Sequence, residues 1–370
     1  MSLAPCIYLD YNATSPVRMG VHESVTRALK AVGNPSSIHT CGRTARCLIE
    51  EAREALAQLV GTSPPSIIFT SGGTEAAALA LQSLPSGPRL VSSIEHPCMM
   101  PHMALAEPFP VTQDGCVDLA WLEDRLARSP KPGAVVTMLA NNETGVIQPI
   151  RRLVDLAHAA GAVVLCDAVQ ALGKIPIGFD DLGVDAMVVS GHKCGAPQGV
   201  GALVVRDSFP LIPLVVGGGQ ERGQRGGTPN TPGIAGFGAA VRSLLTGGSH
   251  EQARLNSLHI MLEDGIRTMA PQARIWGMCA PRLSTTTCVG LPGVDQQRQV
   301  MALDLSGVAV SAGSACSSGK VAPSHVLMAM GATNAQACEA IRISLGWATT
   351  ESDIQAFLRA WEPLVRASEK

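Results

Sequence analysis

Short apolar runs alternate with amphipathic segments through the first half of the chain. Each run has the length of a buried strand, whereas residues 44–60 place Leu48 and Leu56 on one apolar face and predict an amphipathic helix. Strands that alternate with helices are typical of a mainly parallel sheet with helices on both faces, so we expect a doubly wound α/β fold. The predicted strands are residues 66–70, 89–93, 134–139, 162–166, 185–189 and 201–205.

A glycine-rich stretch separates this pattern from the last third of the chain. Residues 216–238 combine many glycines with two prolines and predict a long functional loop. The pair Gly247 and Gly248 then interrupts a helical pattern, which favours a domain boundary. We expect a large domain at residues 1–246 and a smaller α+β domain at residues 247–370. The smaller domain is predicted to hold a helix at 252–269, strands at 284–289 and 308–311, a Gly/Ser loop and helices to the end.

Composition and charge exclude several classes of protein. Hydrophobic residues make up 46% of the chain, which excludes a disordered or fibrous protein, and only 3% of the residues are aromatic, so the core must be mainly aliphatic. The 28 basic residues nearly balance the 30 acidic ones, so no global field attracts nucleic acid or an anionic membrane. The apolar run at residues 159–164 is too short to span a bilayer. We expect neither a nucleic acid nor a membrane as partner.

The eleven cysteines indicate a reducing compartment. They are scattered and form no C-x-x-C pair, in a chain far longer than disulfide-stapled secreted domains. The start of the chain lacks the basic and apolar regions of a secretion signal, so we expect a cytoplasmic protein. His39, Cys41 and Cys47 lie close in the sequence but lack paired ligand spacing, and no metal is expected.

Polar clusters follow five of the six predicted strands. They offer hydroxyl, amide, carboxylate, imidazole and amine groups that a polar ligand can use. Because ligands of open α/β sheets bind beyond the carboxyl ends of the strands, we expect the clusters to meet at one site. The clusters are residues 71–75, 95–96, 141–143, 167–170 and 190–193.

Three of these clusters fit one cofactor. Small residues and Thr74 at a predicted helix start suit a phosphate, although an ordinary helix cap gives the same pattern. Lys193 ends a buried strand, where desolvation favours a neutral amine that bonds to carbonyl groups, although most lysines are simply solvated. Asp167 is a carboxylate in an apolar stretch and needs a cationic or N–H partner, unless it only caps a helix. Pyridoxal 5'-phosphate needs these three contacts, for its phosphate, its aldehyde and its pyridinium nitrogen.

A series of longer motifs runs in order over nearly the whole chain. The motifs are Tyr8-Leu9-Asp10-Tyr11-Asn12-Ala13-Thr14, Gly33-Asn34-Pro35-Ser36-Ser37, Thr70-Ser71-Gly72-Gly73-Thr74-Glu75, Asn141-Asn142-Glu143-Thr144-Gly145, Asp167-Ala168-Val169-Gln170, Ser190-Gly191-His192-Lys193 and the segment from Glu221 to Thr228. This series resembles the cysteine desulfurases of the class V aminotransferase family. The resemblance implies the type I fold of pyridoxal-phosphate enzymes and a homodimer, with residues 1–14 expected to pack with the smaller domain.

The resemblance also implies a role for each matching residue around the cofactor. Lys193 bonds covalently to the cofactor, and Asp167 pairs with its ring nitrogen. His96 stacks on the ring and assists proton transfer, unless it is a satisfied core histidine. Gln170 and Asn142 donate hydrogen bonds around the ring and the substrate. The phosphate is expected on Gly73, Thr74, Ser190 and His192, with Thr228 reaching it from the second subunit.

The substrate contacts follow from the same resemblance. L-Cysteine is expected at Asn34, Asn142 and Arg342. The planar fork of Arg342 suits bidentate binding of a carboxylate, although an arginine at this place also suits an ion pair between domains.

One cysteine decides which reaction the sequence predicts. Cys316 lies among small residues and glycines, which is typical of an exposed loop, whereas most other cysteines lie in apolar segments. The rival nucleophile is Cys98, which follows Pro97 in a more fixed position. The resemblance implies conversion of L-cysteine to L-alanine, with the sulfur held on Cys316 as a persulfide and passed to an acceptor protein such as an iron–sulfur scaffold. Alternatives are a selenocysteine lyase, an aminotransferase, or a non-catalytic pyridoxal-phosphate protein that serves as an interaction scaffold.

Overall fold

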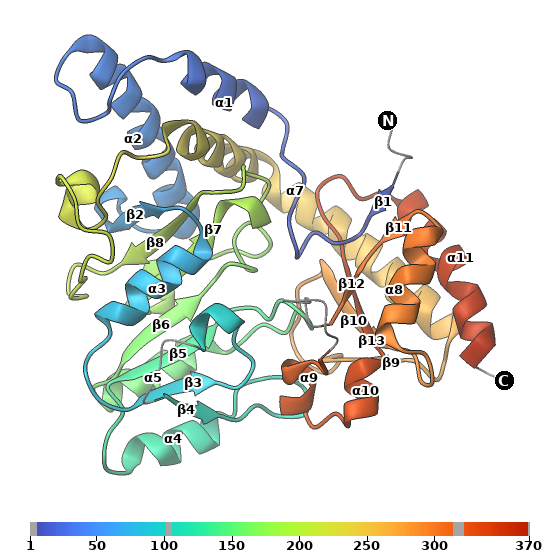
Figure 1. Cartoon of the computed structure of the whole chain (residues 1–370). Helices are drawn as coiled ribbons and strands as arrows, with labels where there is room; N and C mark the ends of the chain where they lie inside the picture. The colour runs from blue at the N-terminus through green and yellow to red at the C-terminus, as the bar shows by residue number, and fades with distance from the viewer. Residues whose placement is uncertain (1–5, 101–105, 314–321, 369–370) are drawn as a thin grey trace.

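A seven-stranded sheet forms the centre of the larger part of the molecule (Figure 1). The structure is a computed structural model that describes residues 6–100, 106–313 and 322–368. Neighbouring strands run parallel except in the two pairs that β8 makes, which confirms the mainly parallel α/β fold. The strand order is β2 (Ile67–Thr70), β8 (Gly201–Val205), β7 (Ala186–Ser190), β6 (Val163–Asp167), β5 (Ala134–Met138), β3 (Arg89–Ser92) and β4 (Ala106–Phe109).

Helices cover both faces of this sheet, which explains why its strands are apolar without alternation. Successive residues of one strand pack in opposite clusters: Val135 faces the cluster that contains α2 and α5, and Val136 faces the cluster that contains α3. We call these two clusters together the sheet core. The helices of this region are α1 (Val21–Lys30), α2 (Thr40–Val60), α3 (Gly73–Ser83), α4 (Leu119–Ala127), α5 (Ile150–Ala159) and α6 (Phe179–Leu182), with 3-10 turns η1 (Pro64–Ser66), η2 (Pro97–Met99), η3 (Gly191–Lys193) and η4 (Gln220–Gly223).

The predicted helix break at Gly247 and Gly248 is wrong. Helix α7 (Thr231–Met269) runs through both glycines for 39 residues, and it begins inside the stretch that was expected to be a loop. Two glycines weaken a helix by roughly 1 kcal/mol each. Apolar packing at both ends of α7 offsets this, since Leu244 belongs to the sheet core and Leu258 to a second cluster. No element ends at residue 246, and the division into domains stays a prediction.

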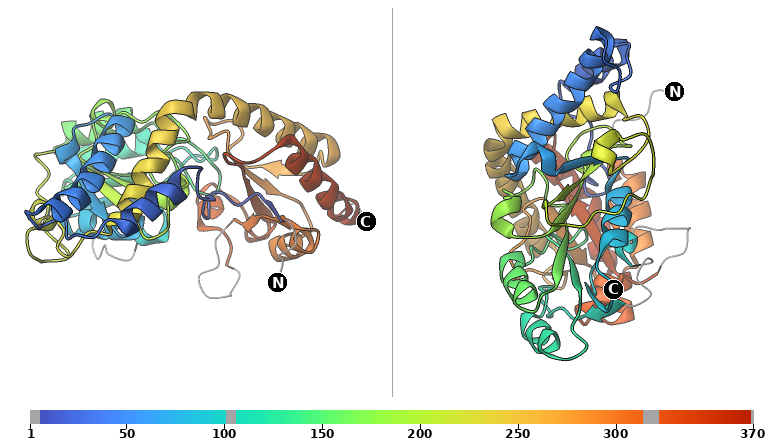
Figure 2. Two further views of the ribbon diagram at one scale, coloured as in Figure 1. Left: turned by 90° about the horizontal axis from the view of Figure 1, so that it is seen from above. Right: turned by 90° about the vertical axis from the view of Figure 1, so that its left-hand side faces the viewer.

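The second cluster, here the C-terminal core, forms around a four-stranded antiparallel sheet and the far half of α7 (Figure 2). The first described strand, β1 (Ile7–Tyr8), also lies there, parallel to β11 (Val308–Ala309). The four-stranded sheet has the order β12 (Ser311–Ala312), β13 (Ala340–Ser344), β10 (Thr286–Gly290) and β9 (Arg274–Ile275). The accompanying helices are α8 (Gln296–Leu305), α9 (His325–Ala329), α10 (Asn334–Cys338) and α11 (Glu351–Ser368).

Strand β13 is the main element of this part that the sequence pattern missed. Its residues are all buried, but Arg342 and Ser344 interrupt the apolar run. Both polar side chains find partners, because Arg342 pairs with Asp10 and Ser344 bonds to the N-terminal segment. None of the helices among the described residues is long and apolar enough to cross a membrane.

The continuity of α7 gives a test by substitution. Gly247→Ala should stabilise the protein by about 0.5–1 kcal/mol, because the position is helical and an added Cβ would meet open space. The matched control in the same helix is Gly238→Ala, whose Cβ would lie 2.7 Å from the Ala52 Cα and should destabilise the protein by about 1–3 kcal/mol. Urea unfolding measures both values. Destabilisation by Gly247→Ala would show that the helix does break there.

Candidate active site

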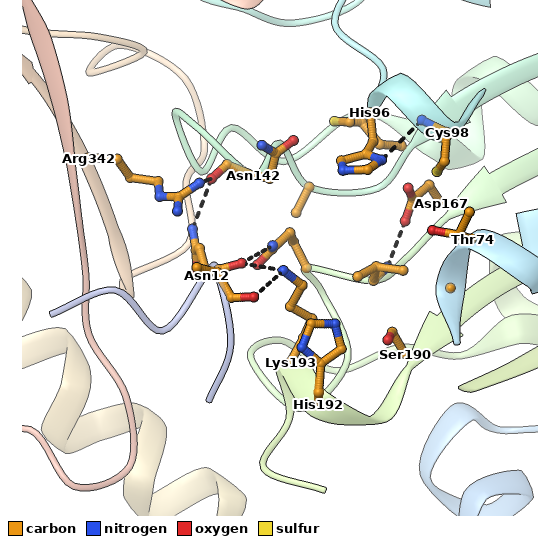
Figure 3. A pocket seen from close by; sticks show the side chains of 16 residues that line it. Asn12, Thr74, His96, Cys98, Asn142, Asp167, Ser190, His192, Lys193 and Arg342 are labelled. Atoms are coloured by element: carbon orange, nitrogen blue, oxygen red, sulfur yellow. Dashed lines mark hydrogen bonds between the residues drawn. The ribbon is translucent and has the colours of Figure 1, made fainter. Parts of the chain in front are cut away.

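The carboxyl ends of the sheet strands surround a cavity of about 360 Å³. Figure 3 shows Arg342 on one side of it, Asp167 and Thr74 on the other, and Lys193 between them. The structure thus brings together side chains from all five predicted clusters, and the N-terminal segment and β13 close the remaining wall. The cavity residues that sequence analysis singled out are Gly73, Thr74, His96, Cys98, Asn142, Asp167, Gln170, Ser190, His192, Lys193 and Arg342.

Two predicted site residues do not line this cavity, and a third lies outside the described residues. Thr228 lines a separate hollow with Ser71 and Arg225. Asn34 is exposed, and its Oδ1 accepts a hydrogen bond of 2.9 Å from the Ser36 N–H. Cys316 lies outside the described residues.

Lys193 is a buried amine held by main-chain oxygens. It lies in η3, directly after β7, and its Nζ donates to the carbonyl oxygens of Asn12 at 2.6 Å and Ala13 at 2.7 Å. Burial, and then the charge of Arg342, lower its pKa to about 8. A lysine with this pKa has a substantial uncharged fraction near neutral pH, as a nucleophilic or basic amine requires.

A second buried amine lies beside the first. Lys174 Nζ donates to the side-chain oxygens of Asn12 at 2.6 Å and Gln170 at 2.7 Å, and burial lowers its pKa well below the usual range. The sequence pattern does not identify this residue. The available signal was its spacing of four from Gln170, but the bond to Asn12 joins segments 162 residues apart.

Asp167 and Glu95 form a pair of buried carboxyl groups at the ends of β6 and β3. Asp167 Oδ1 accepts a hydrogen bond of 2.8 Å from the Val169 N–H, and burial raises its pKa to about 6. Glu95 Oε1 accepts hydrogen bonds from Ser92 and Met138, whereas its Oε2 has no hydrogen-bond partner in the ranges that the structure describes. Burial, and then the charge of Asp167, raise the pKa of Glu95 to about 8. The sequence pattern assigns Glu95 no role, because a glutamate before His96 is also typical of an ordinary polar turn.

The far end of the cavity suits a phosphate. Helix α3 begins after Gly72 without a side-chain cap, so N–H groups of its first turn remain available to an anion. A Cβ at Gly73 would lie 3.1 Å from the Val169 side chain and 3.4 Å from Ser190 Cβ, so a larger residue would crowd this wall. Burial, and then the charge of Lys193, lower the pKa of His192 to about 4, which leaves its ring neutral.

These features fit pyridoxal phosphate. Asp167 is 6% exposed, lines the cavity and forms no ion pair with any residue that the structure describes, so its charge lacks a cation. A protonated ring nitrogen would supply that cation, while the start of α3 would take the phosphate and Lys193 the aldehyde carbon.

His96 and Cys98 form a compact turn at the rim of the cavity. The Nδ1 of His96 accepts a hydrogen bond of 3.2 Å from the Cys98 N–H, so Nε2 carries the proton of the neutral ring. Burial, and then Lys193, lower the pKa of His96, which favours this neutral form. Burial, and then Asp167 and Glu95, raise the pKa of the Cys98 thiol to about 12. Cys98 is therefore a poor source of thiolate.

Arg342 reaches the cavity from β13 with a 3% exposed side chain. Its Nη2 lies 2.7 Å from Asp10 Oδ1, and its Nη1 donates to the Asn142 carbonyl oxygen at 3.1 Å. Its buried Nε has no partner among the described residues. The ion pair that the sequence left as an alternative is therefore present.

Comparison with known proteins identifies the family. The family model described as Aminotransferase class-V matches residues 7–357, and the chain belongs to this family. A cysteine desulfurase of Cereibacter sphaeroides is 41% identical over 97% of this chain and 95% of its own length. An IscS-like cysteine desulfurase of Mycobacterium tuberculosis is 37% identical over 95% of this chain and 94% of its own length.

Solved structures agree with this assignment. A NifS-like protein from Rickettsia africae matches with a TM-score of 0.90 at 35% identity, over 97% of this chain and 99% of that one. SspA, solved in complex with cysteine, matches with a TM-score of 0.79 at 32% identity, over 91% of this chain and 98% of that one. Family membership confirms the type I fold and pyridoxal phosphate as the cofactor, so the chain is a pyridoxal-phosphate-dependent enzyme.

The burial of Glu95 predicts a dependence of stability on pH. Its pKa is raised from 4.5 to about 8, so the folded state holds this proton more tightly than the unfolded state does. The resulting stabilisation is complete below about pH 4.5 and is lost as the pH rises through about 8. Glu95→Gln cannot titrate, so its free energy of unfolding should rise relative to wild type between pH 5 and 8 in urea unfolding.

The control for this experiment is Glu54→Gln, the same substitution at an exposed position of α2. The difference between this variant and wild type should be nearly constant with pH. A constant difference for Glu95→Gln as well would mean that Glu95 is ionised in the folded protein.

Proposed function

We propose that this protein is a cysteine desulfurase that converts L-cysteine to L-alanine and holds the sulfur on Cys316 as a persulfide. The observation that carries the proposal is the cavity that combines Lys193, Asp167 and Arg342, in a chain whose relatives include named cysteine desulfurases. Cysteine as the substrate is supported by the relative solved with it.

Bound pyridoxal phosphate supplies an electron sink that stabilises negative charge on the substrate α-carbon. Asp167 holds the ring nitrogen, since a pKa of about 6 leaves its carboxylate ionised at neutral pH. The start of α3 with Gly73 and Thr74, together with Ser190 and His192, holds the phosphate.

The chain's own groups bind the substrate and move its protons. Arg342 binds the substrate carboxylate, with Asn142 beside it. Lys193 Nζ takes the α-proton, because its lowered pKa leaves an uncharged fraction at neutral pH. His96 presents the proton on Nε2 to the substrate. Gln170, which accepts a hydrogen bond from Lys174 and donates one to the Asn12 carbonyl oxygen, would contact the ring.

Cys316 receives the sulfur. Its thiolate attacks the substrate sulfur, so that an S–S bond forms as the C–S bond breaks and the substrate carbon takes up a proton as alanine. The sequence places Cys316 among small residues, and the raised pKa of Cys98 argues against the rival thiol in the cavity. The persulfide then passes to a thiol acceptor, such as an iron–sulfur scaffold.

A second copy of the chain is proposed to complete the site. Thr228 lies in a hollow apart from the cavity of its own chain, which fits a role in the site of a partner subunit. A neighbouring hollow is lined by residues 35–36 and 218–222, among others. Two apolar side chains close to these segments in the sequence are exposed: Ile38 is 90% exposed and Val216 is 86% exposed. Apolar exposure of this degree favours coverage by another subunit. Asn34, near the same hollow, is proposed to contact substrate only in that dimer.

The reaction is tested by Cys316→Ser. Cofactor absorbance and cysteine binding should persist, because the cavity residues are unchanged. Alanine release without an added keto acid should fall by at least about a hundredfold, since a hydroxyl is a poor nucleophile toward sulfur. Intact-mass analysis should show one added sulfur after cysteine treatment in wild type and none in the variant.

The control is Cys98→Ser, which should keep both alanine release and the added sulfur. Near-normal turnover of Cys316→Ser would show that Cys316 is not the acceptor of the substrate sulfur. A requirement for a keto acid would favour an aminotransferase, and a much higher rate with selenocysteine would favour a selenocysteine lyase.

The shared site is tested by mixing two inactive variants. Lys193→Ala lacks the amine and Thr228→Ala lacks the hydroxyl proposed to reach across, so mixed dimers should regain part of the activity in one of their two sites. Sedimentation should show a dimer for each variant. An active monomer, or no recovery from a verified mixed dimer, would contradict the shared site.

A further inference from the structure

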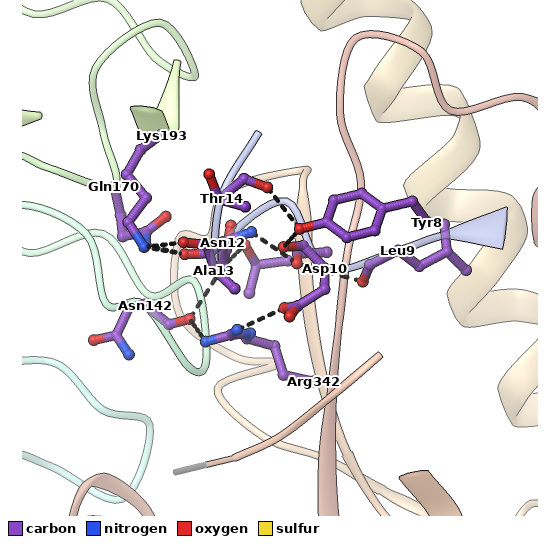
Figure 4. A network of polar contacts seen from close by, with 12 residues as sticks. Tyr8, Leu9, Asp10, Asn12, Ala13, Thr14, Asn142, Gln170, Lys193 and Arg342 are labelled. Carbon is purple, nitrogen blue, oxygen red and sulfur yellow. Dashed lines mark hydrogen bonds and ion pairs between the residues drawn. The ribbon is translucent and has the colours of Figure 1, made fainter. Parts of the chain in front are cut away.

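Arg342 is held by the N-terminal segment. Figure 4 shows this segment passing between Arg342 and Lys193, with Asp10 directed at the guanidinium. Asp10 Oδ1 lies 2.7 Å from Nη2 of Arg342, and Asp10 also bridges to Ser344, two residues along β13. The carbonyl oxygens of Asn12 and Ala13 bind Lys193. One short segment therefore contacts both ends of the space that an amino acid would occupy.

The position of Asp10 is fixed by its main chain. Its carbonyl oxygen accepts hydrogen bonds from the Tyr8 hydroxyl at 3.0 Å and from the Ala13 N–H at 3.0 Å. The side chain is 18% exposed, whereas that of Arg342 is 3% exposed. A guanidinium buried to this degree needs an anion nearby, and Asp10 provides it when no substrate is bound.

A ligand carboxylate that binds Arg342 must share the Nη2 nitrogen with the carboxylate of Asp10. A guanidinium binds a carboxylate bidentately through Nε and Nη2 or through Nη1 and Nη2, and both edges include the nitrogen that contacts Asp10. An incoming carboxylate therefore encounters the like charge of Asp10 at Nη2. The net attraction of the site for a carboxylate alone is reduced.

We propose that Asp10 weakens the binding of every carboxylate to Arg342, so that an acid without an amino group is held poorly at this site. An amino acid gains a second attachment through its amine on the Lys193 side of the cavity, and this compensates for the repulsion by Asp10. A simple carboxylate has no such compensation. The inference rests on the proposed role of Arg342 in binding the substrate carboxylate. It adds a reason why small acids that lack an amine bind weakly at Arg342.

The test uses the pyridoxal-phosphate-loaded protein and propionate, a carboxylate without an amine or a thiol. Calorimetry should show that Asp10→Asn binds propionate about tenfold more tightly than wild type, because the amide keeps the shape of Asp10 and removes its charge. Propionate should also raise the thermal midpoint of the variant more than that of wild type. The matched control is Asp114→Asn, an equal charge change at an exposed position, which should bind propionate as wild type does.

A double-variant cycle connects the effect to Arg342. Asp10→Asn should give no gain in propionate binding when Arg342→Ala is also present. Unchanged or weaker propionate binding by Asp10→Asn alone would overturn the inference, since Asp10 would then only position Arg342. If Arg342→Ala leaves propionate and cysteine binding unchanged, Arg342 is not the carboxylate site. This result differs from the one that overturns only the role of Asp10, so the experiment distinguishes the two failures.

Discussion

The hydrogen bonds from Lys193 to two main-chain carbonyl oxygens are the contact on which the site depends. They bury an amine without a carboxylate partner among the described residues, so the group is solvated by dipoles and its uncharged form remains accessible. The carbonyl oxygens belong to Asn12 and Ala13, and Asn12 in turn bonds to Asn142 and Thr286. The geometry around the amine is therefore set jointly by the sheet, the N-terminal segment and the C-terminal core.

The cavity concentrates polar groups that lack partners. Within the part of the chain that the structure describes, Asp167 has no ion-pair partner, Glu95 has an oxygen without a hydrogen bond, and Arg342 has an unpartnered Nε. Each such group opposes folding by an amount of about 1–3 kcal/mol. The surrounding aliphatic packing must outweigh this, and a cofactor and substrate that pair with the same groups recover part of it. The groups that the proposed function needs therefore lower the stability of the folded protein.

The sequence predicts the sheet better than the surrounding parts because the sheet strands are buried on both faces. All six predicted strands overlap observed ones, whereas β4 was missed because Glu107 and Pro108 interrupt it. Strand β13 was missed for the same reason, since its polar residues are paired by segments far away. The prediction of a break at Gly247 and Gly248 is wrong because the low helix propensity of two glycines costs less free energy than packing at the two ends of α7 provides.

The residues of the candidate site likewise fall into those that the sequence pattern predicts and those that it does not. Lys193, Asp167 and the start of α3 could be predicted because each follows a strand that the pattern identifies, and strand ends converge by topology. Asp10, Glu95 and Lys174 could not, because their importance depends on partners rather than on residue type. Asp10 meets Arg342 across 332 positions of sequence, and no local pattern encodes that contact.

The pairing of β1 with β11 has a consequence for the order in which the protein is made. Ile7 lies opposite Val308, so the segment that holds Lys193 is anchored to a strand synthesised some 300 residues later. The sheet can form while the ribosome is still translating the C-terminal part, but the N-terminal segment has no strand to join until then. The amine is therefore fixed in place only after Val308 has been synthesised.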